Sequence, residues 1–474
     1  MPDVDIPAKQ RALVFQGSVA LGAFEAGVFK RLYEIIKIQD PNWEKRMFDI
    51  VAGTSAGAIN AAILTSHVKE SRTWEGSARK LVEYWKDHLS SSTPAITYQG
   101  VHWWDEYYQW WGKYYARTSS SGDSIRAVAS EEAARRYYST KYFFANGAPN
   151  VFSPAFPFPQ PDSKFFDNNP LFPPTNLWLR YSNEPLRNSL EHMDQYGKKF
   201  IDFPLATSFD DEQPRLLAVC VDVQHGKAVT FDSYSRKSNF QAYDPDAGEY
   251  VDHTVKYDKG IMVEHLMASA SFPVYFDYEV VDGRKFWDGG ILSNTPLREL
   301  LQSHRDYWHK DRGAEKVPDL EVYIVNVWPS VEKNVPIDHD GVVDRKNDIT
   351  HSDQTEYDQK VALLVSDYYN LANKLLALAK EKGATDVEIN AILTKDASCK
   401  SMKRTGVRRY YEDLMKGRFD LQRVVTIEHK DDPDSISNKW ADYTSETINK
   451  LIMEGEEFDK NAVVKIMPVD QEII

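Results

Sequence analysis

The stretch Val51-Ala-Gly-Thr-Ser-Ala-Gly-Ala-Ile-Asn60 places one hydroxyl-bearing serine between two glycines, directly after an apolar run. The residues before it, Phe48–Ala52 (FDIVA), have the character of a buried strand. The Ala- and Ile-rich residues Ser55–Ser66 are typical of a helix. The sequence therefore predicts a strand, a tight turn and a helix in direct succession, with Ser55 in the turn.

The turn Gly53-Thr-Ser-Ala-Gly57 matches the pattern G-x-S-x-G. Small residues on both sides allow the chain to reverse sharply, so that a serine at the start of the helix can project toward a substrate. The helix N-terminus also places partial positive charge beside a developing oxyanion. The pattern alone fits a flexible Gly/Ala loop as well, but its position between a strand and a helix favours Ser55 as a nucleophile.

A nucleophilic serine needs a base, and Phe286-Trp-Asp-Gly-Gly-Ile291 offers a carboxylate at the end of a predicted strand. Gly289 and Gly290 allow another segment of backbone to approach Asp288 closely. A carboxylate in this position can accept the serine proton and later return it. The alternative is an aspartate that only stabilises its own turn, which is common before two glycines.

A third turn, Gln16-Gly-Ser-Val-Ala-Leu-Gly22, joins the predicted strand Arg11–Gln16 to a helix. Backbone N–H groups in such a turn can bind an anion. The turn matches neither G-x-x-x-x-G-K-[ST] nor G-x-G-x-x-G, which argues against a nucleotide site.

Strands alternate with helices along the chain, which predicts an α/β fold with a mostly parallel central sheet. We expect residues 1–474 to form a single catalytic domain. Residues 90–210 are rich in proline and aromatic residues and are interpreted as an inserted cap, and residues 340–418 as a helical insertion or extension. Within the latter, residues 360–382 predict a long helix that ends at Gly383.

Composition narrows the classes of partner. The net charge is −14 with no run of Lys or Arg, which argues against nucleic acid. The two cysteines and scattered histidines lack metal-ligand spacing, so neither a metal nor another cofactor is expected. The N-terminus lacks the features of a signal peptide, and no apolar stretch approaches the ~18 residues of a membrane span. We therefore expect a cytoplasmic protein.

Residues 98–115 (YQGVHWWDEYYQWWGKYY) hold nine aromatic side chains in eighteen positions. Such a segment can bind acyl chains or contact a membrane surface, because Trp and Tyr join an apolar body to a polar tip. The favoured alternative is a cap packed on the core or a subunit interface. Residues 152–172 belong to the same insertion and are candidates to shape an acyl pocket.

The three turns occur in an order and spacing that resemble the patatin-like phospholipase family. The resemblance covers roughly residues 10–66 and 214–330, and includes SASFPVYF followed by KFWDGGILSNTPL. It implies a three-layer α/β/α hydrolase with a Ser–Asp dyad, in which Ser55 is the nucleophile and Asp288 the base. The implied substrate is an acyl lipid or phospholipid, and no cofactor is implied.

The family's oxyanion loop usually reads G-G-G-x-[RK]-G, and its counterpart here is Gly17, Ser18, Val19, Ala20, Leu21 and Gly22. The sequence departs from that pattern at Ser18, Val19 and Leu21. The backbone N–H donors survive these substitutions, but serine and especially β-branched valine resist positive φ. If Val19 needs positive φ the oxyanion hole is compromised, whereas a β conformation there leaves it intact.

We therefore expect a lipid acyl hydrolase that forms an acyl-enzyme on Ser55. One alternative is a catalytically weakened patatin-like module that binds lipid or protein, and another is a non-lipid esterase or thioesterase. A Ser–Asp–His triad is a further option, because four histidines follow Asp288 in the sequence: His304, His309, His351 and His429.

Overall fold

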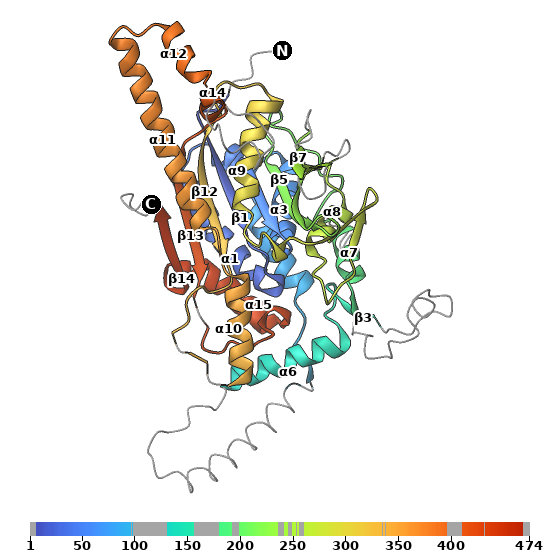
Figure 1. Cartoon of the computed structure of the whole chain (residues 1–474). Coiled ribbons are helices and arrows are strands. Elements are labelled where there is room, and N and C mark those ends of the chain that lie inside the picture. Colours follow the sequence, from blue (N-terminus) through green and yellow to red (C-terminus); the bar gives the residue numbers. More distant parts are fainter. Residues whose placement is uncertain are drawn as a thin grey trace.

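The structure is a computed structural model that describes residues 6–95, 97, 130–155, 180–191, 199–235, 241–244, 249–252, 254–255, 260–333, 335–336, 338–395, 410–430 and 432–467. Its centre is a mixed β-sheet with the strand order β10-β11-β5-β2-β1-β12-β13-β14 (Figure 1). The aromatic segment 98–115 and residues 156–172 of the predicted acyl pocket lie outside the described residues.

The middle of the sheet is parallel. Five neighbouring strands run in one direction, and antiparallel strands complete both edges. The parallel strands are β5 (Arg215–Asp222), β2 (Ile50–Thr54), β1 (Lys9–Phe15), β12 (Asp319–Asn326) and β13 (Leu421–His429). The antiparallel neighbours are β10 (Glu279–Val281), β11 (Arg284–Asp288), β6 (Lys227–Asp232) and β14 (Ala462–Met467). The short strand β9 (Thr254–Val255) pairs with β6.

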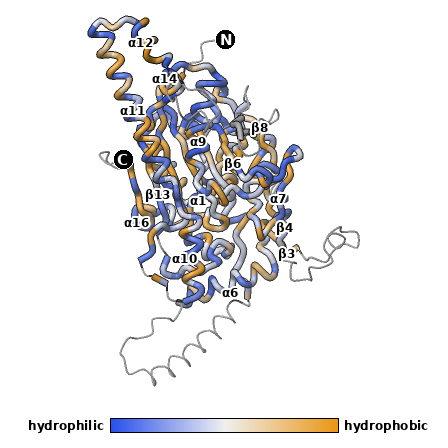
Figure 2. Tube along the Cα trace, viewed as in Figure 1, coloured by the Kyte–Doolittle hydropathy of each residue, from blue (hydrophilic) through white to orange (hydrophobic). Residues whose placement is uncertain are grey.

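Helices cover both faces of this sheet, as expected for parallel strands with apolar residues on each side. One face packs against α1 (Gly22–Gln39), α3 (Ala56–Ser71), α8 (Val263–Ala270) and α15 (Ser445–Glu456). The other packs against α9 (Leu297–Asp306) and α11 (Glu356–Glu381). The apolar colour of the central strands is visible in Figure 2. The predicted three-layer α/β/α fold is confirmed.

Two hairpins lie at the edge of the sheet near Asp288. Gly226 turns the chain between β5 and β6 with φ 60°. Asp282 and Gly283 turn it between β10 and β11, with φ 48° and 79°. Two successive residues with positive φ are typical of the type I′ turn, whose twist matches that of the flanking strands.

The segment 70–89, which its periodicity predicts to be one helix, is interrupted. Helix α3 ends at Ser71, and Gly76 adopts φ 83° before α4 (Ser77–Glu83) begins. A π-helical turn, Tyr84–Leu89, then completes the segment. The apolar spacing continues across the break because Trp74 and Trp85 are both buried in the same core.

The parts of segment 90–210 that the structure describes include two helices, α6 (Glu131–Asn146) and α7 (Glu184–Glu191), and a strand pair, β3 (Ser153–Ala155) with β4 (Arg180–Ser182). A second strand pair, β7 (Gln241–Asp244) with β8 (Glu249–Asp252), lies outside the main sheet. Further short helices are α2 (Trp43–Arg46), α10 (His339–His351), α12 (Asp386–Leu393), α14 (Tyr411–Met415) and α16 (Phe458–Asn461).

The first and last large helices touch through their backbones. Glycines lie at the crossing of α1 and α15, and a Cβ on Gly27 would come 2.1 Å from the carbonyl oxygen of Ile452. A Cβ on Gly455 would come 2.3 Å from the carbonyl oxygen of Phe24. Helix α15 thereby covers α1, which carries the oxyanion-loop turn at its N-terminus.

Candidate active site

Ser55 occupies a sharp turn between β2 and α3. Its backbone has φ 55° and ψ −125°, a conformation that L-residues rarely adopt. The two flanking glycines are required sterically, because a Cβ on Gly53 would come 2.3 Å from the backbone of Gly57. A Cβ on Gly57 would in turn come 2.7 Å from the carbonyl oxygens of Phe15 and Gln16. The strand–turn–helix geometry predicted from the sequence is present.

A serine from another helix supports the strained turn. The Ser55 N–H donates to Ser269 Oγ at 2.9 Å, and the Ser269 hydroxyl donates to the Val219 carbonyl at 2.6 Å. The Thr54 hydroxyl also donates to the Ser293 carbonyl at 2.8 Å. These buried contacts fix the backbone on both sides of Ser55 and help to hold its positive φ.

The sheet topology brings Asp288 to Ser55. Thr54 pairs with Val219 on one side of β5, and Asp288 pairs with Cys220 on the other. Gly289 then passes over the end of β5, where a Cβ would come 2.8 Å from Thr54 Cγ2. The Ser55 hydroxyl lies close enough to the Asp288 carboxyl to act as one of the donors that lower its pKa.

Asp288 is buried, and hydrogen bonds with nearby backbone groups fix both its own backbone and its carboxylate. Its N–H donates to the Ser271 carbonyl at 3.0 Å, and its Oδ1 accepts the Gly290 N–H at 2.7 Å. Burial raises the pKa of the Asp288 carboxyl from 3.8 to about 7, although the hydrogen bonds from Ser55 and Gly290 act to lower it. A carboxyl with a pKa near neutrality can both accept and return a proton at physiological pH.

The turn at residues 17–19 lies beside Ser55 and Asp288, and one of its backbone N–H groups, that of Gly17, already donates a hydrogen bond. The Gly17 N–H donates to the Asn294 carbonyl at 2.9 Å, and Trp328 Nε1–H donates to the Gly17 carbonyl at 2.8 Å. The Gly17 N–H is therefore not free to bind an oxyanion, although the resemblance places Gly17 in the predicted oxyanion loop. Among the described residues, the N–H groups of Ser18 and Val19 have no backbone acceptor.

Val19 adopts φ 50°, the conformation that its β-branched side chain disfavours. The hydrogen bonds of Gly17 with Asn294 and Trp328, both distant in sequence, fix the start of the turn. A local bond from the Leu21 N–H to the Ser18 carbonyl, at 3.1 Å, closes it. The Val19 side chain also packs on the main core. Of the two alternatives left by the sequence, the positive-φ conformation, which the sequence linked to a compromised oxyanion hole, is the one present. The packing around the turn holds Val19 in this conformation, and its N–H donor is retained.

Asn294 links the oxyanion loop to the aspartate loop. A Cβ on Gly17 would come 2.2 Å from Asn294 Oδ1, and a Cβ on Gly290 would come 2.9 Å from the same atom. Asn294 Nδ2–H donates to the His351 carbonyl at 2.7 Å. Both glycines thus make room for one amide side chain, which the sequence motifs do not reveal because Asn294 lies four residues past Gly290.

A buried polar network lies beneath the loop. Gly22, the last residue of the predicted loop, begins α1 against the Trp85 ring, which a Cβ would approach to 2.7 Å. Trp85 Nε1–H donates to Asn60 Oδ1, and Asn60 Nδ2–H donates to Glu25 Oε2, both at 2.8 Å. Burial raises the pKa of the Glu25 carboxyl well above its usual value, although the hydrogen bonds from Asn60 and from the Gln16 backbone act to lower it.

None of the four candidate histidines is hydrogen-bonded to Ser55 or Asp288. His304 bonds to the Pro318 carbonyl, His309 to the Ala314 carbonyl and His429 to Glu454. The His351 ring packs against Phe272 and Trp328, with centroids 5.8 Å and 5.1 Å apart. The contacts of these four rings therefore do not place any of them beside Ser55 or Asp288 as a third member.

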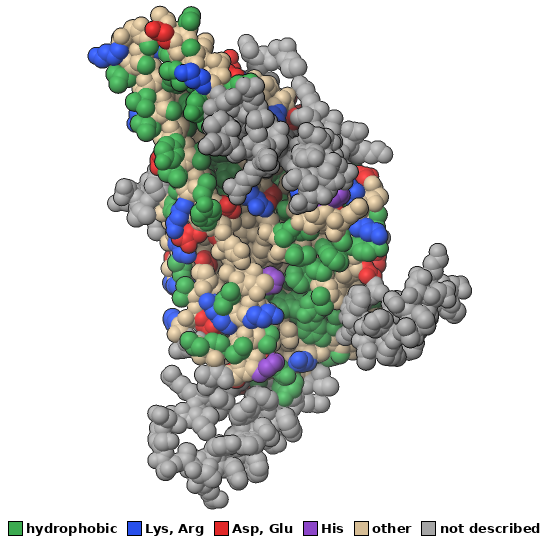
Figure 3. All heavy atoms as spheres, viewed as in Figure 1, with side chains coloured by type: hydrophobic (Ala, Val, Ile, Leu, Met, Phe, Trp, Pro, Cys, Tyr) green, Lys and Arg blue, Asp and Glu red, His purple; other side chains and the backbone are tan. Residues whose placement is uncertain are grey.

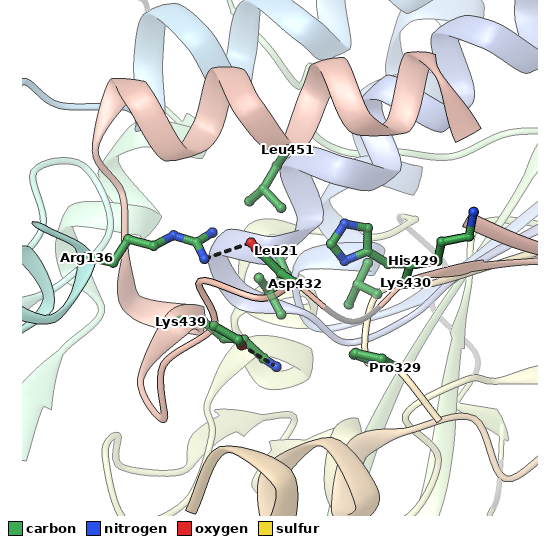
Figure 4. Close-up of a pocket in the computed structure, with 10 residues that line it drawn as sticks. Leu21, Arg136, Pro329, His429, Lys430, Asp432, Lys439 and Leu451 are labelled. Atoms are coloured by element: carbon green, nitrogen blue, oxygen red, sulfur yellow. Dashed lines mark hydrogen bonds and ion pairs between the residues drawn. The ribbon is translucent and has the colours of Figure 1, made fainter. Parts of the chain in front are cut away.

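A small pocket is lined by Leu21, at the end of the turn at residues 17–21, together with Arg136 and residues from the C-terminal part of the chain (Figure 4). Neither Ser55 nor Asp288 lines it. Its walls include Leu21, Arg136, His429, Asp432 and Lys439. Two of its three cationic residues form ion pairs: Arg136 with Asp432 at 2.8 Å, and Lys439 with Asp348 at 2.6 Å and Asp344 at 3.1 Å. The pocket walls are thus tied together by ion pairs behind the oxyanion loop.

Comparison with known families agrees with this geometry. A model of the patatin-like phospholipase family matches residues 13–301, which include all three turns and both residues of the pair. The chain belongs to the patatin-like phospholipase family. Membership supports lipid acyl hydrolysis in general as its activity.

Comparison with solved structures yields a crystal structure of VipD from Legionella pneumophila. It is 12% identical, the match covers 97% of this chain and 68% of that one, and the TM-score of 0.29 is too low to support an argument. No curated protein sequence matches the chain. In the described part of the patatin-like chain, no helix is long and apolar enough to cross a membrane.

Proposed function

We propose that this protein is a serine lipid acyl hydrolase in which Ser55 and Asp288 form a catalytic dyad. The observation that carries the proposal is the strained turn that the sheet places beside Asp288, a buried carboxyl whose pKa is raised to about 7. A serine hydroxyl is a weak nucleophile unless a base in contact with it accepts its proton. Asp288 is the base that this pair provides.

In the first half of the reaction, Ser55 Oγ attacks the ester carbonyl carbon and its proton passes to Asp288. The N–H groups of Ser18 and Val19, with the N-terminus of α3, stabilise the negative oxygen of the tetrahedral intermediate. The intermediate collapses when the carbon–oxygen bond to the leaving alcohol breaks. Asp288 gives its proton to that alcohol, and an acyl-enzyme remains on Ser55.

In the second half, Asp288 takes a proton from water as the water oxygen attacks the acyl carbonyl. A second tetrahedral intermediate forms in the same cradle of N–H groups. Its collapse breaks the bond to Ser55 Oγ, which regains a proton from Asp288, and the fatty acid leaves. The proton balance closes without a histidine because one carboxyl acts as base and then as acid.

Exposed apolar side chains near Asp288 support an acyl-lipid substrate rather than a polar ester. Ile291 and Leu292 follow the aspartate directly and are 43% and 50% exposed, and Val274, in the loop before β10, is 70% exposed. Figure 3 shows hydrophobic side chains gathered on one face of the molecule. Such residues can contact acyl chains or a lipid surface.

A fluorophosphonate probe tests the dyad directly. We expect the wild type to be labelled and Ser55→Ala to remain unlabelled. Asp288→Asn should be labelled far more slowly, because the hydroxyl then lacks a base. Rapid labelling of Asp288→Asn would assign the base elsewhere.

Two other functions are distinguished by the same experiments. A weakened lipid- or protein-binding module is favoured by the strained Val19 and the engaged Gly17 N–H, and predicts no labelling in any lipid or detergent. A non-lipid esterase or thioesterase predicts labelling, with turnover of short-chain p-nitrophenyl esters or acyl thioesters but not of phospholipids or lysophospholipids.

A further inference from the structure

Helix α11 carries an apolar stripe that nothing in the described part of the chain covers. Seven side chains along it are more than a third exposed, from 37% for Val361 to 76% for Tyr357. The others are Leu364, Tyr368, Leu371, Leu375 and Leu378. Single exposed apolar residues are common on protein surfaces, but a continuous stripe along a helix of 26 residues marks an interface.

The opposite face of α11 is the one that packs on the body of the protein. Gln359 and Ser366 are buried, and Ser366 Oγ accepts the Leu421 N–H at 3.1 Å. Ala362 and Leu363 pack against the core beneath the sheet. The apolar stripe therefore points away from the molecule and is not a loosely packed part of its own core.

The stripe has the spacing of a coiled coil. Its members are separated alternately by four and three residues, from Tyr357 through Leu378, over three heptads. In heptad terms, the a positions are Val361, Tyr368 and Leu375, and the d positions are Tyr357, Leu364, Leu371 and Leu378. An apolar residue at every a and d position is the pattern that seats one helix against another.

The charges beside the stripe indicate which helix fits. The four g positions are Lys360, Asp367, Lys374 and Glu381. In an antiparallel pair of identical α11 helices, each layer of the core joins an a residue of one helix to a d residue of the other. These layers are Val361 with Leu378, Leu364 with Leu375, and Tyr368 with Leu371. The g residues then face each other across the seam, Lys360 opposite Glu381 and Asp367 opposite Lys374. Both pairs are oppositely charged, and two-fold symmetry gives four such contacts.

A parallel pair does not have this match. There each g residue faces the e residue five positions later on the other helix. Those e residues are Val365, Ala372 and Ala379, none of which is charged. The charge pattern therefore favours the antiparallel arrangement.

We propose that α11 binds α11 of a second copy of this chain as a symmetric antiparallel coiled coil. Figure 1 shows the C-terminal half of α11, with α12, extending beyond the rest of the molecule. In the proposed dimer, the projecting C-terminal half of each α11 lies along the N-terminal half of the partner α11, which packs on its own sheet. The remainder of each chain then lies at opposite ends of the coiled coil. The proposal does not depend on the catalytic function.

A lipid surface is the other occupant that an apolar stripe suggests. Helix α11 contains four acidic and three basic residues, so it lacks the excess of Lys and Arg that is typical of helices bound to anionic membranes. A membrane contact also gives no reason for complementary charges at fixed positions along the stripe. These observations favour a second copy of the chain.

Light scattering coupled to size-exclusion chromatography tests the dimer on the full chain. We expect the wild type to have the mass of a dimer. The double variant Leu364→Glu/Leu371→Glu should raise the dissociation constant about 100-fold or more, because it places charges in the seam. Ala377→Glu adds a charge to an exposed position of the same helix outside the seam and should leave the dimer intact.

Cross-linking tests the orientation. In a Cys399→Ser background, a mixture of Val361→Cys and Leu378→Cys chains should form a disulfide between the two variants, while neither variant alone should do so. Disulfides in each variant alone would show a parallel pair and overturn the proposed register. The remaining native cysteine, Cys220, is buried.

Two results would reject the second copy as the occupant. One is a monomeric wild type at the highest soluble concentration. The other is a monomer that binds phosphatidylcholine–phosphatidylglycerol vesicles in the wild type but not in Leu364→Glu/Leu371→Glu. An unchanged far-UV circular dichroism spectrum of that double variant serves as the control for folding, and it does not depend on the catalytic function.

Discussion

Replacing Asp288 by asparagine should stabilise the protein at alkaline pH while abolishing turnover. The folded-state pKa of Asp288 is raised from 3.8 to about 7 by burial. A raised pKa means that the carboxyl contributes stability below its unfolded pKa, and that this contribution is lost as pH rises through about 7. Asparagine resembles aspartic acid in shape but does not ionise, so the variant escapes that loss.

The size of the effect follows from the two pKa values. Compared with a side chain that stays neutral, Asp288 lowers the free energy of unfolding by an amount that depends on pH. The loss is about 4 kcal/mol at pH 8, about 2 kcal/mol at pH 5 and under about 1 kcal/mol at pH 4. The pH-dependent part between pH 5 and pH 8 is thus about 2–3 kcal/mol. For a chain of 474 residues, an unfolding entropy of about 1 kcal/mol/K gives a relative rise in Tm of about 2–3 °C.

The assay compares the melting temperatures of wild type and Asp288→Asn from pH 5 to pH 8. The matched control is Ser55→Ala, which also abolishes turnover but leaves the buried carboxyl in place and removes a hydrogen bond that lowers its pKa. That control should show no gain at pH 8. A difference between Asp288→Asn and wild type that does not change from pH 5 to pH 8 would refute the argument from burial.

Three further predictions concern the same site. The value of kcat/KM should rise with pH to a plateau with a midpoint near the Asp288 pKa of about 7, changing about tenfold per pH unit below it; a profile flat from pH 5 to 8 would exclude this base. Gly53→Ala should destabilise the fold by about 3 kcal/mol or more in urea unfolding, because its Cβ would lie 2.3 Å from Gly57, whereas Gly226→Ala, with open space around it, should cost only about 1 kcal/mol. Val19→Gly should keep turnover within about threefold because glycine accepts φ 50° and retains the N–H, whereas Val19→Pro should lose it; equal activity of the two would remove Val19 from the oxyanion hole.

The parts of the site that could be predicted from sequence are those with a local cause. The turn at Ser55 follows from an apolar strand, two glycines and a helix-forming run within about twenty residues. The position of Asp288 at a strand end follows equally from its neighbours. The helix 360–382 was also predictable, because its apolar spacing and the glycine at 383 are adjacent features.

The parts that could not be predicted depend on contacts between distant segments. The Gly17 N–H is occupied by Asn294, a residue 277 positions later. The φ of Val19 is imposed against its own preference by the contacts of the turn, including the bond from Trp328 to Gly17. Ser269 holds the Ser55 amide, although nothing in its local sequence distinguishes it from other buried serines.

The position of β1 has a consequence for the order in which the molecule can be built. This strand, made within the first fifteen residues, lies between β2 and β12, and α1 after it is covered by α15 near the other end of the chain. A ribosome that has made the nucleophile and its base has still not made β12, β13 or α15. The nascent chain therefore carries Ser55 and Asp288 before β12, one of the two neighbours of its first strand, exists, and assembly of the proposed dyad must wait until β12, β13 and α15 are synthesised.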